Sequence, residues 1–172
     1  MLMTLSPIHK KYCITRVIVS TYQSITGTGR IAINQLNNEY KKISGEKAYK
    51  YQIHQNVIPQ CDDFIENGYT KEEMKLVNET HKILDKNISI SATAVRVPII
   101  GGHCESINLT LENPFELNNI KNLLSNSEGV VVEDDPSNLI YPMPLNSNGK
   151  DDVFVGRIRR DYSCENSLNL WV

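Results

Sequence analysis

Residues 87–112, NISISATAVRVPIIGGHCESINLTLE, contain the pattern that decides the fold. Apolar and polar residues alternate in both halves of this stretch, which predicts one strand over 87–98 and a second over 105–112. The first strand places on one face Ile88, Ile90, Ala92, Ala94 and Arg96. The second strand places on one face Ile107, Leu109 and Leu111. Two strands that follow each other with no helix between them favour an α+β domain.

The rest of the chain supplies more strands than helices. Further strands are predicted over 16–23, 129–135, 152–161 and 167–172. Helices are predicted over 30–43, 71–85 and 113–124, and the first dozen residues resemble the end of another helix. The predicted fold is therefore α+β, with a mixed, largely antiparallel sheet.

Three of these helices carry local signals. Thr70 and Glu73 have the spacing of a capping box, which predicts the start of the helix over 71–85. Asn113 as the cap and Pro114 in the first turn predict the start of the helix over 113–124. In the helix over 30–43, the apolar stripe consists of Ile33, Leu36 and Tyr40.

Length and composition restrict the class of protein. The 172 residues suffice for one domain over 1–172. A net charge of -2 gives no electrostatic reason to expect nucleic acid or an anionic membrane as a partner, and no apolar run is long enough to span a bilayer. The four cysteines are scattered without a CxxC pair, which argues against a metal site and predicts reduced thiols in a cytoplasmic protein.

Arg96 and His103 are the first candidates for chemistry. Arg96 ends an otherwise apolar strand face, where it is either a snorkelling side chain at a sheet edge or a fork that grips a carboxylate with two hydrogen bonds. His103 follows Gly101 and Gly102, which permit a close backbone approach. A lone histidine is more often structural, but a loop position beside an arginine favours a general acid or base.

Other polar residues are ambiguous by themselves. Glu72 and Lys75 share a helix face, where a solvated surface pair is the simplest interpretation. Gln23 precedes a glycine turn, GTGR, that lacks the full pattern of a dinucleotide-binding loop. Arg157 and Arg159 share a strand face and are expected to be exposed.

Four ordered blocks together resemble one family. They are VSTYQSITGTG, NVIPQCDDFIENGYTKEEMKLVNETHKIL, SATAVRVPIIGGHCES and GKDDVFVGRIRRDYSCENSLNLWV. They look like the C-terminal catalytic and dimerisation domain of the aspartate-semialdehyde dehydrogenase family, and they cover nearly the whole chain. The resemblance implies a fold like the C-terminal domain of glyceraldehyde-phosphate dehydrogenase, with helices on one face of the sheet.

The resemblance also implies a reaction. Members reduce L-aspartyl 4-phosphate with NADPH to L-aspartate 4-semialdehyde and phosphate, through a cysteine thioester, on the route to lysine, threonine, methionine and diaminopimelate. The implied cofactor is NADP, and the implied assembly is a homodimer, with a tetramer as a possible further state. By matching motif, the implied catalytic residues are His103 and Gln23. The implied substrate-binding residues are Arg96 for the α-carboxylate, Glu72 for the amino group and Lys75 for phosphate. Thr26 and Gly27 match a Ser-Gly pair near the nicotinamide.

The chain departs from the family pattern in ways that matter for activity. The nucleophile motif NC[ST]T is absent, and none of Cys13, Cys61, Cys104 and Cys164 matches it. The N-terminal dinucleotide-binding domain is also absent from the 172 residues. We therefore expect a fragment that is inactive alone. The alternatives are a non-catalytic dimerisation or binding module of the same fold, and an enzyme similar to N-acetylglutamyl-phosphate reductase.

Overall fold

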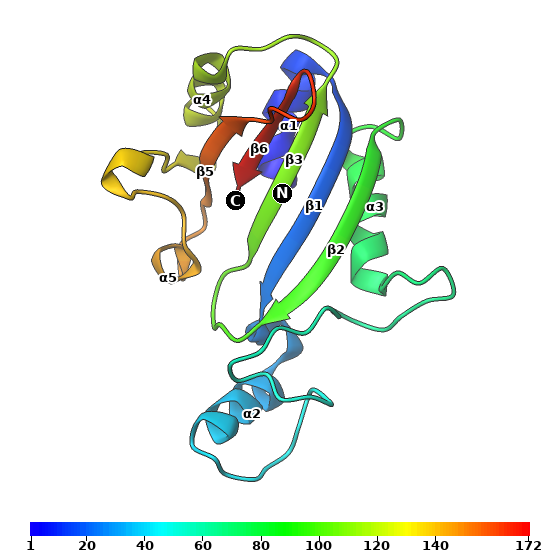
Figure 1. The fold of residues 1–172 in the computed structure, drawn as a ribbon, viewed down its shortest axis with the longest axis vertical. Helices are drawn as coiled ribbons and strands as arrows, with labels where there is room; N and C mark the ends of the chain where they lie inside the picture. The colour runs from blue at the N-terminus through cyan, green and yellow to red at the C-terminus, as the bar shows by residue number, and fades with distance from the viewer.

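A six-stranded sheet organises the computed structural model, which describes residues 1–172 (Figure 1). The strands are β1 (Ile14–Ser24), β2 (Ser89–Val97), β3 (Cys104–Leu111), β4 (Val130–Val132), β5 (Val153–Arg160) and β6 (Ser167–Trp171). The α-helices are α1 (Leu2–Tyr12), α2 (Arg30–Tyr40), α3 (Lys71–Ile83), α4 (Leu117–Ser125) and α5 (Pro144–Ser147). Two 3-10 helices are η1 (Ile25–Thr28) and η2 (Pro136–Asn138). None of the helices combines the length and the apolar character needed to cross a membrane.

The sheet is mixed, as the sequence predicted. Its strand order is β2-β1-β3-β6-β5-β4. The β1–β2 and β4–β5 pairs are parallel, and the β1–β3, β3–β6 and β5–β6 pairs are antiparallel. The parallel β1–β2 pair has a functional consequence, because the carboxyl ends of both strands meet at the same edge of the sheet.

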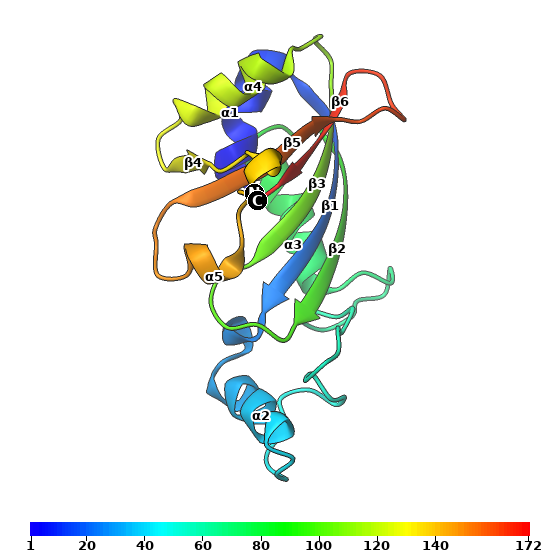
Figure 2. The same cartoon turned by 60° about the vertical axis from the view of Figure 1, so that its left-hand side comes forward.

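The main core lies between one sheet face and three helices. The apolar faces predicted for β2 and β3 point into it, and most of their members are buried. Helices α1 and α4 add four fully buried side chains, which are Leu5, Ile8, Ile120 and Leu124. Partly buried Leu76 and Leu84 of the α3 region pack against the same cluster. Figure 2 shows these helices gathered on one side of the curved sheet, which confirms the expected arrangement.

The opposite face of the sheet has no helical cover. Tyr22 of β1 is 37% exposed there, and its ring lies 5.4 Å from the ring of Trp171 in β6. Arg157 and Arg159 of β5 are exposed, as expected, and line a depression that also includes Trp171. This face, with its mixture of aromatic, apolar and polar side chains, is called the open sheet face below.

Helix α2 lies beyond the end of the sheet and has a small core of its own (Figure 1). That core consists of Ile25, Ala32, Ile53 and Ile58. The predicted stripe of α2 is wrong at its last member, because Tyr40 is 71% exposed. Gln35 is buried instead, where its amide exchanges hydrogen bonds with the backbone of Tyr49 and Tyr51. A propensity argument misses this because the buried group is polar and is satisfied by a distant loop.

Three predicted element boundaries are wrong. Helix α2 ends at Tyr40 and not at residue 43. Helix α4 begins at Leu117, and Asn113 does not cap it. The backbone N–H of Asn113 bonds to the Tyr12 carbonyl, and Phe115 is buried under the Arg160 guanidinium, whereas Asn113, Pro114 and Glu116 are exposed. The strand predicted over 129–135 ends at Val132. It stops because Asp135 caps a turn that begins with Pro136.

Candidate functional site

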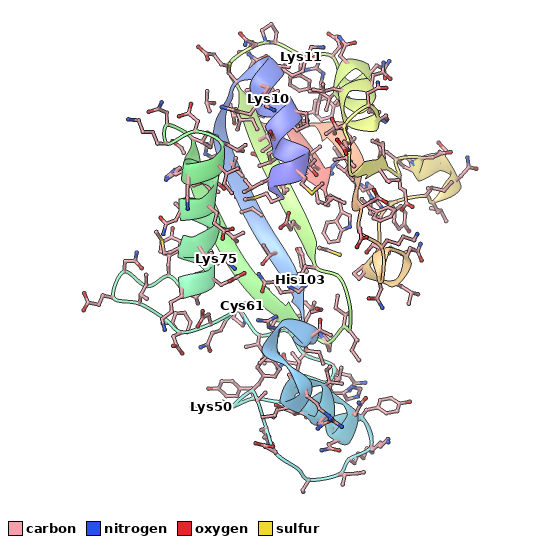
Figure 3. The ribbon with its side chains drawn as sticks, turned by 180° about the vertical axis from the view of Figure 1, so that it is seen from behind. Lys10, Lys11, Lys50, Cys61, Lys75 and His103 are labelled. Atoms are coloured by element: carbon pink, nitrogen blue, oxygen red, sulfur yellow. The ribbon has the colours of Figure 1, made fainter.

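A polar cavity lies where β1 and β2 end. Its volume is about 430 Å³, and only one of its nine lining residues is hydrophobic. The lining residues are Gln23, Gly27, Thr28, Cys61, Asp62, Glu72, Lys75, Arg96 and His103. Six of the seven residues expected to carry function therefore meet in one place, although they are spread over 80 positions of sequence from Gln23 to His103. Figure 3 shows Lys75, Cys61 and His103 approaching the same end of the sheet from three different segments.

Strand register brings Gln23 and Arg96 side by side. In the parallel β1–β2 pair, Gln23 lies opposite Arg96. Gln23 is 5% exposed, and its side-chain amide donates a hydrogen bond of 3.1 Å to Oε1 of Glu72. Gln23 thereby connects the sheet to helix α3 at the floor of the cavity.

Helix α3 supplies Glu72 and Lys75. Its start is fixed by the predicted capping box, in which Thr70 accepts from the Glu73 N–H and Glu73 accepts from the Thr70 N–H. Glu72 and Lys75 follow on one face, with Nζ of Lys75 3.7 Å from Oε2 of Glu72. The Lys75 side chain is 59% exposed, so it can swing toward a ligand at little cost.

Arg96 is the most enclosed cation of the site. The residue is 7% exposed, and its backbone N–H and carbonyl both form hydrogen bonds with the backbone of Ile58. Its Nη1 donates to the Ser24 carbonyl at 2.6 Å, whereas its buried Nε has no hydrogen-bond partner. A buried guanidinium without a carboxylate partner is costly unless an anion binds to it. The 7% exposure of Arg96 argues against the snorkelling interpretation, because the part of the residue that stays accessible lines the cavity and not the outer surface.

His103 is held at the mouth of the cavity by the glycine loop. Gly101 has a φ of +109°, and a Cβ there would lie 2.6 Å from Oδ1 of Asn148, so the loop requires glycine. Nδ1 of His103 accepts a hydrogen bond of 3.2 Å from the Ser24 N–H, while the residue as a whole stays exposed. Partial burial and the Arg96 charge lower the pKa of His103 below its usual value, which favours the neutral imidazole.

Gly27 and Thr26 contribute in different ways. Gly27 lines the cavity, and a Cβ there would lie 3.4 Å from Nη1 of Arg96 and 3.9 Å from Nε2 of His103. Because Gly27 has no side chain, there is room for a flat group beside the side chains of Arg96 and His103. Thr26 does not line the cavity, because its hydroxyl bonds to the Gly101 carbonyl at 3.2 Å and to the Ser24 hydroxyl. Thr26 therefore braces η1 against the glycine loop.

Sequence reasoning missed Thr28, Cys61 and Asp62 as members of the site. Thr28 ends the short helix η1, and Cys61 and Asp62 lie in the irregular segment before α3, where no periodicity indicates which side chains turn inward. The Cys61 side chain is buried, and burial raises the pKa of its thiol to about 11, against a smaller opposing effect of Arg96. Such a thiol stays protonated at neutral pH and is a poor nucleophile. Nowhere do three His, Cys, Asp or Glu side chains gather in a metal-binding arrangement.

Comparisons with known proteins identify relatives of the chain. The chain is 45% identical over 179 residues to an aspartate-semialdehyde dehydrogenase of Aquifex aeolicus, across 100% of the chain and 53% of that relative. A solved aspartate semialdehyde dehydrogenase II of Vibrio cholerae, complexed with ASA, superposes with a TM-score of 0.94 at 37% identity, over 99% of the chain and 52% of that protein. An aspartate semialdehyde dehydrogenase of Candida albicans, solved with NADP, shares the fold at a TM-score of 0.68 and 24% identity, over 99% of the chain and 48% of that protein.

The matches cover the whole chain but only part of each relative. The chain spans about half the length of the curated relatives that it matches. The family model for the semialdehyde dehydrogenase dimerisation domain matches residues 5–172, which is almost the whole chain. The 172 residues therefore belong to the semialdehyde dehydrogenase family, as its dimerisation domain.

Proposed function

We propose that this chain is the substrate-binding and dimerisation part of an aspartate-semialdehyde dehydrogenase. The complete enzyme converts L-aspartyl 4-phosphate and NADPH to L-aspartate 4-semialdehyde, phosphate and NADP. In the first step a thiolate attacks the acyl carbon and the bond from that carbon to phosphate oxygen breaks, which leaves a thioester. The thioester carbon then receives a hydride, the aldehyde forms, and the sulfur leaves as a thiolate.

The observation that carries this proposal is the set of charges in the 430 Å³ cavity. Arg96 is a buried fork suited to the substrate α-carboxylate. Lys75 is an exposed, mobile cation suited to the phosphate, and Glu72 is a carboxylate suited to the ammonium group. Gln23 fixes the position of Glu72 through the 3.1 Å hydrogen bond. These groups match the three charges of aspartyl phosphate one by one.

His103 is the group that moves protons. Its lowered pKa keeps the imidazole neutral near pH 7, which is the state required to take a proton from a thiol. The resulting imidazolium can return that proton later in the cycle. We infer that the thiol is supplied by residues outside these 172, because Cys61, which lines the cavity, has a pKa raised to about 11.

The cofactor assignment rests on Gly27. The bare backbone of Gly27 beside His103 and Arg96 is a wall against which a nicotinamide ring fits, and Thr26 holds that wall in place through its bond to the Gly101 carbonyl. NADPH, when bound, supplies the hydride that reduces the thioester carbon. The remaining contacts to NADP belong to the dinucleotide-binding half of the enzyme.

The proposal also includes a homodimer and a cytoplasmic location. A homodimer forms through the open sheet face, where Tyr22 and Trp171 remain uncovered in the single chain. All four cysteines are free thiols, which suits the reducing conditions of the cytoplasm.

The test measures phosphate-dependent NADPH formation from aspartate semialdehyde. We expect no turnover from the 172-residue chain alone, and turnover when the same chain is expressed behind the dinucleotide-binding half of the enzyme. In that enzyme, Arg96→Lys is expected to raise the KM for the semialdehyde about tenfold or more, since it removes a planar fork from a buried site. Arg16→Lys, on the open sheet face, is the matched control.

Three outcomes would overturn this proposal. Turnover by the chain alone would make one of its own cysteines the nucleophile. A preference for N-acetylglutamate semialdehyde would favour the related reductase, because an acetylated amine offers no ammonium to Glu72. The variant Glu72→Gln separates these two substrates, since only the one with a free ammonium should lose affinity. Substrate binding without turnover in the complete protein would indicate a non-catalytic module.

A further inference from the structure

Ser24 makes an unusual number of contacts within the site. It is the last residue of β1 and is 0% exposed. Its backbone N–H donates to Nδ1 of His103 at 3.2 Å, and its carbonyl accepts from Nη1 of Arg96 at 2.6 Å. Its hydroxyl donates to the Gly101 carbonyl at 2.6 Å, and Oγ also lies 3.2 Å from Nδ1 of His103. One residue therefore contacts the imidazole twice, through groups of opposite hydrogen-bonding character.

The backbone contact suits the neutral imidazole. A backbone N–H can only donate, so Nδ1 of His103 must carry a lone pair when it faces the Ser24 N–H. The proton of the neutral ring is then on Nε2, the atom that lies nearest to the bare backbone of Gly27.

The side-chain contact suits the imidazolium. Protonation places a hydrogen on Nδ1, which can no longer accept from the backbone and needs an acceptor instead. The Ser24 hydroxyl directs its own hydrogen to the Gly101 carbonyl and can accept the hydroxyl hydrogen of Thr26, which leaves its second lone pair available 3.2 Å from Nδ1. A small rotation of the ring exchanges one partner for the other without exposing an unpaired nitrogen.

We propose that Ser24 is a positioning residue that gives Nδ1 of His103 a partner in both protonation states, the backbone N–H for the neutral ring and Oγ for the imidazolium. The inference rests on the acid and base role proposed for His103. Nε2, which lies beside Gly27, can take a proton only when the neutral ring carries its hydrogen on Nδ1, and Oγ is the acceptor for that hydrogen. Without Oγ, this tautomer and the imidazolium would both lose a hydrogen bond and be disfavoured.

Several charged or polar groups other than Ser24 also lie near His103. Arg96 of β2 opposes protonation, while Glu72 of α3, Glu105 of β3 and the Gly102 carbonyl favour it. Lys150 and Asp152 lie across a second cavity that His103 also lines. Ser24→Ala leaves all of these charges in place and removes the hydroxyl together with its bonds to the Gly101 carbonyl and Thr26. Thr26 keeps its own bond to the Gly101 carbonyl, which continues to hold the glycine loop.

The test is an NMR titration of the histidines in the chain, with isotope-labelled rings. In the unsubstituted chain, neutral His103 is expected to carry its proton on Nε2. In Ser24→Ala the backbone N–H remains but the acceptor is lost, so the proton affinity of His103 is expected to fall about threefold to tenfold. Ser20→Ala, on the same strand but directed to the open sheet face, should leave the His103 titration unchanged.

The outcomes that would overturn the inference are specific. A neutral His103 protonated on Nδ1 would contradict the backbone contact. An unchanged titration in a folded Ser24→Ala chain would assign the acceptor role to the Gly102 carbonyl. In the complete enzyme, Ser24→Ala should lower kcat with little change in KM, because the carbonyl that holds Arg96 is retained. The titration needs no turnover, so failure of the proposed enzymatic function and failure of this inference are distinguishable.

Discussion

Glu73 accepts the backbone N–H of Ala94 at 2.9 Å, and this bond joins helix α3 to the edge strand β2. The other oxygen of Glu73 accepts from the Thr70 N–H at 2.8 Å, so one buried carboxylate also closes the start of the helix. Glu72 is the neighbour of Glu73, and Arg96 lies two residues beyond Ala94. The carboxylate thereby sets how far the proposed ammonium-binding group lies from the proposed carboxylate-binding group.

Loss of this link should affect stability and the site together. Glu73→Gln keeps the shape of the side chain but places an NH₂ group against one of the two backbone N–H donors. An unsatisfied buried donor costs about 1–3 kcal/mol, so the free energy of unfolding should fall by about that amount in a urea titration. Glu79→Gln, at an exposed position of the same helix, should be neutral. Equal stabilities for the two variants would contradict the role assigned to Glu73.

The strands of the site could be predicted from the sequence, because their pattern is local. Alternation in residues 87–98 correctly placed Arg96 on the inward face, and the glycine pair correctly placed His103 on a loop. The capping box correctly placed the first turn of α3. From those elements alone, however, nothing indicated that Gln23 and Arg96 are neighbours, since strand pairing is set by contacts distant in sequence.

The contribution of Ser24, and the bond of Glu73 to Ala94 beyond its predicted role in the capping box, could not be predicted from local pattern. Each depends on a partner that lies far along the chain, as Ser24 does on His103, which is 79 positions away. In helix α4, a local sequence signal was present but gave the wrong start of the helix. Asn113 and Pro114 carry a local start signal, but burial of Phe115 outweighs it and delays the helix to Leu117.

The Arg96 charge should be visible in the titration of His103. A neighbouring cation disfavours the imidazolium, and Arg96 is one of the two main causes of the lowered pKa of His103. Arg96→Met removes the cation and keeps an apolar side chain of similar length, so the pKa of His103 should rise toward its usual value. This change is opposite in sign to the one expected for Ser24→Ala. Its measurement is the same NMR titration, and a lower or unchanged pKa would contradict the electrostatic argument.

The four thiols should differ in reactivity. Burial raises the pKa values of Cys61 and Cys104 to about 11, whereas Cys164 is exposed on the β5–β6 connection. At pH 8 a thiol with such a pKa is ionised in only about one molecule in a thousand. Brief treatment with iodoacetamide should therefore label Cys164 first, and labelling of Cys61 and Cys104 should require unfolding, as followed by mass spectrometry of peptides. Rapid labelling of Cys61 in the folded chain would show an activated thiol in the cavity.

The open sheet face should determine the oligomeric state. Tyr22 is 37% exposed beside Trp171, and partly exposed Ile18 lies on the same face, so apolar surface there remains in contact with water unless a second chain covers it. Tyr22→Glu places a charge in the middle of that surface and should convert a dimer to a monomer in light scattering after size exclusion. Tyr162→Glu is the matched control, because Tyr162 is 98% exposed and lies in the turn after β5. If Tyr22→Glu stays dimeric while both variants remain folded, the subunits associate through a different surface, and the exposed side chains around α2 become the next to substitute.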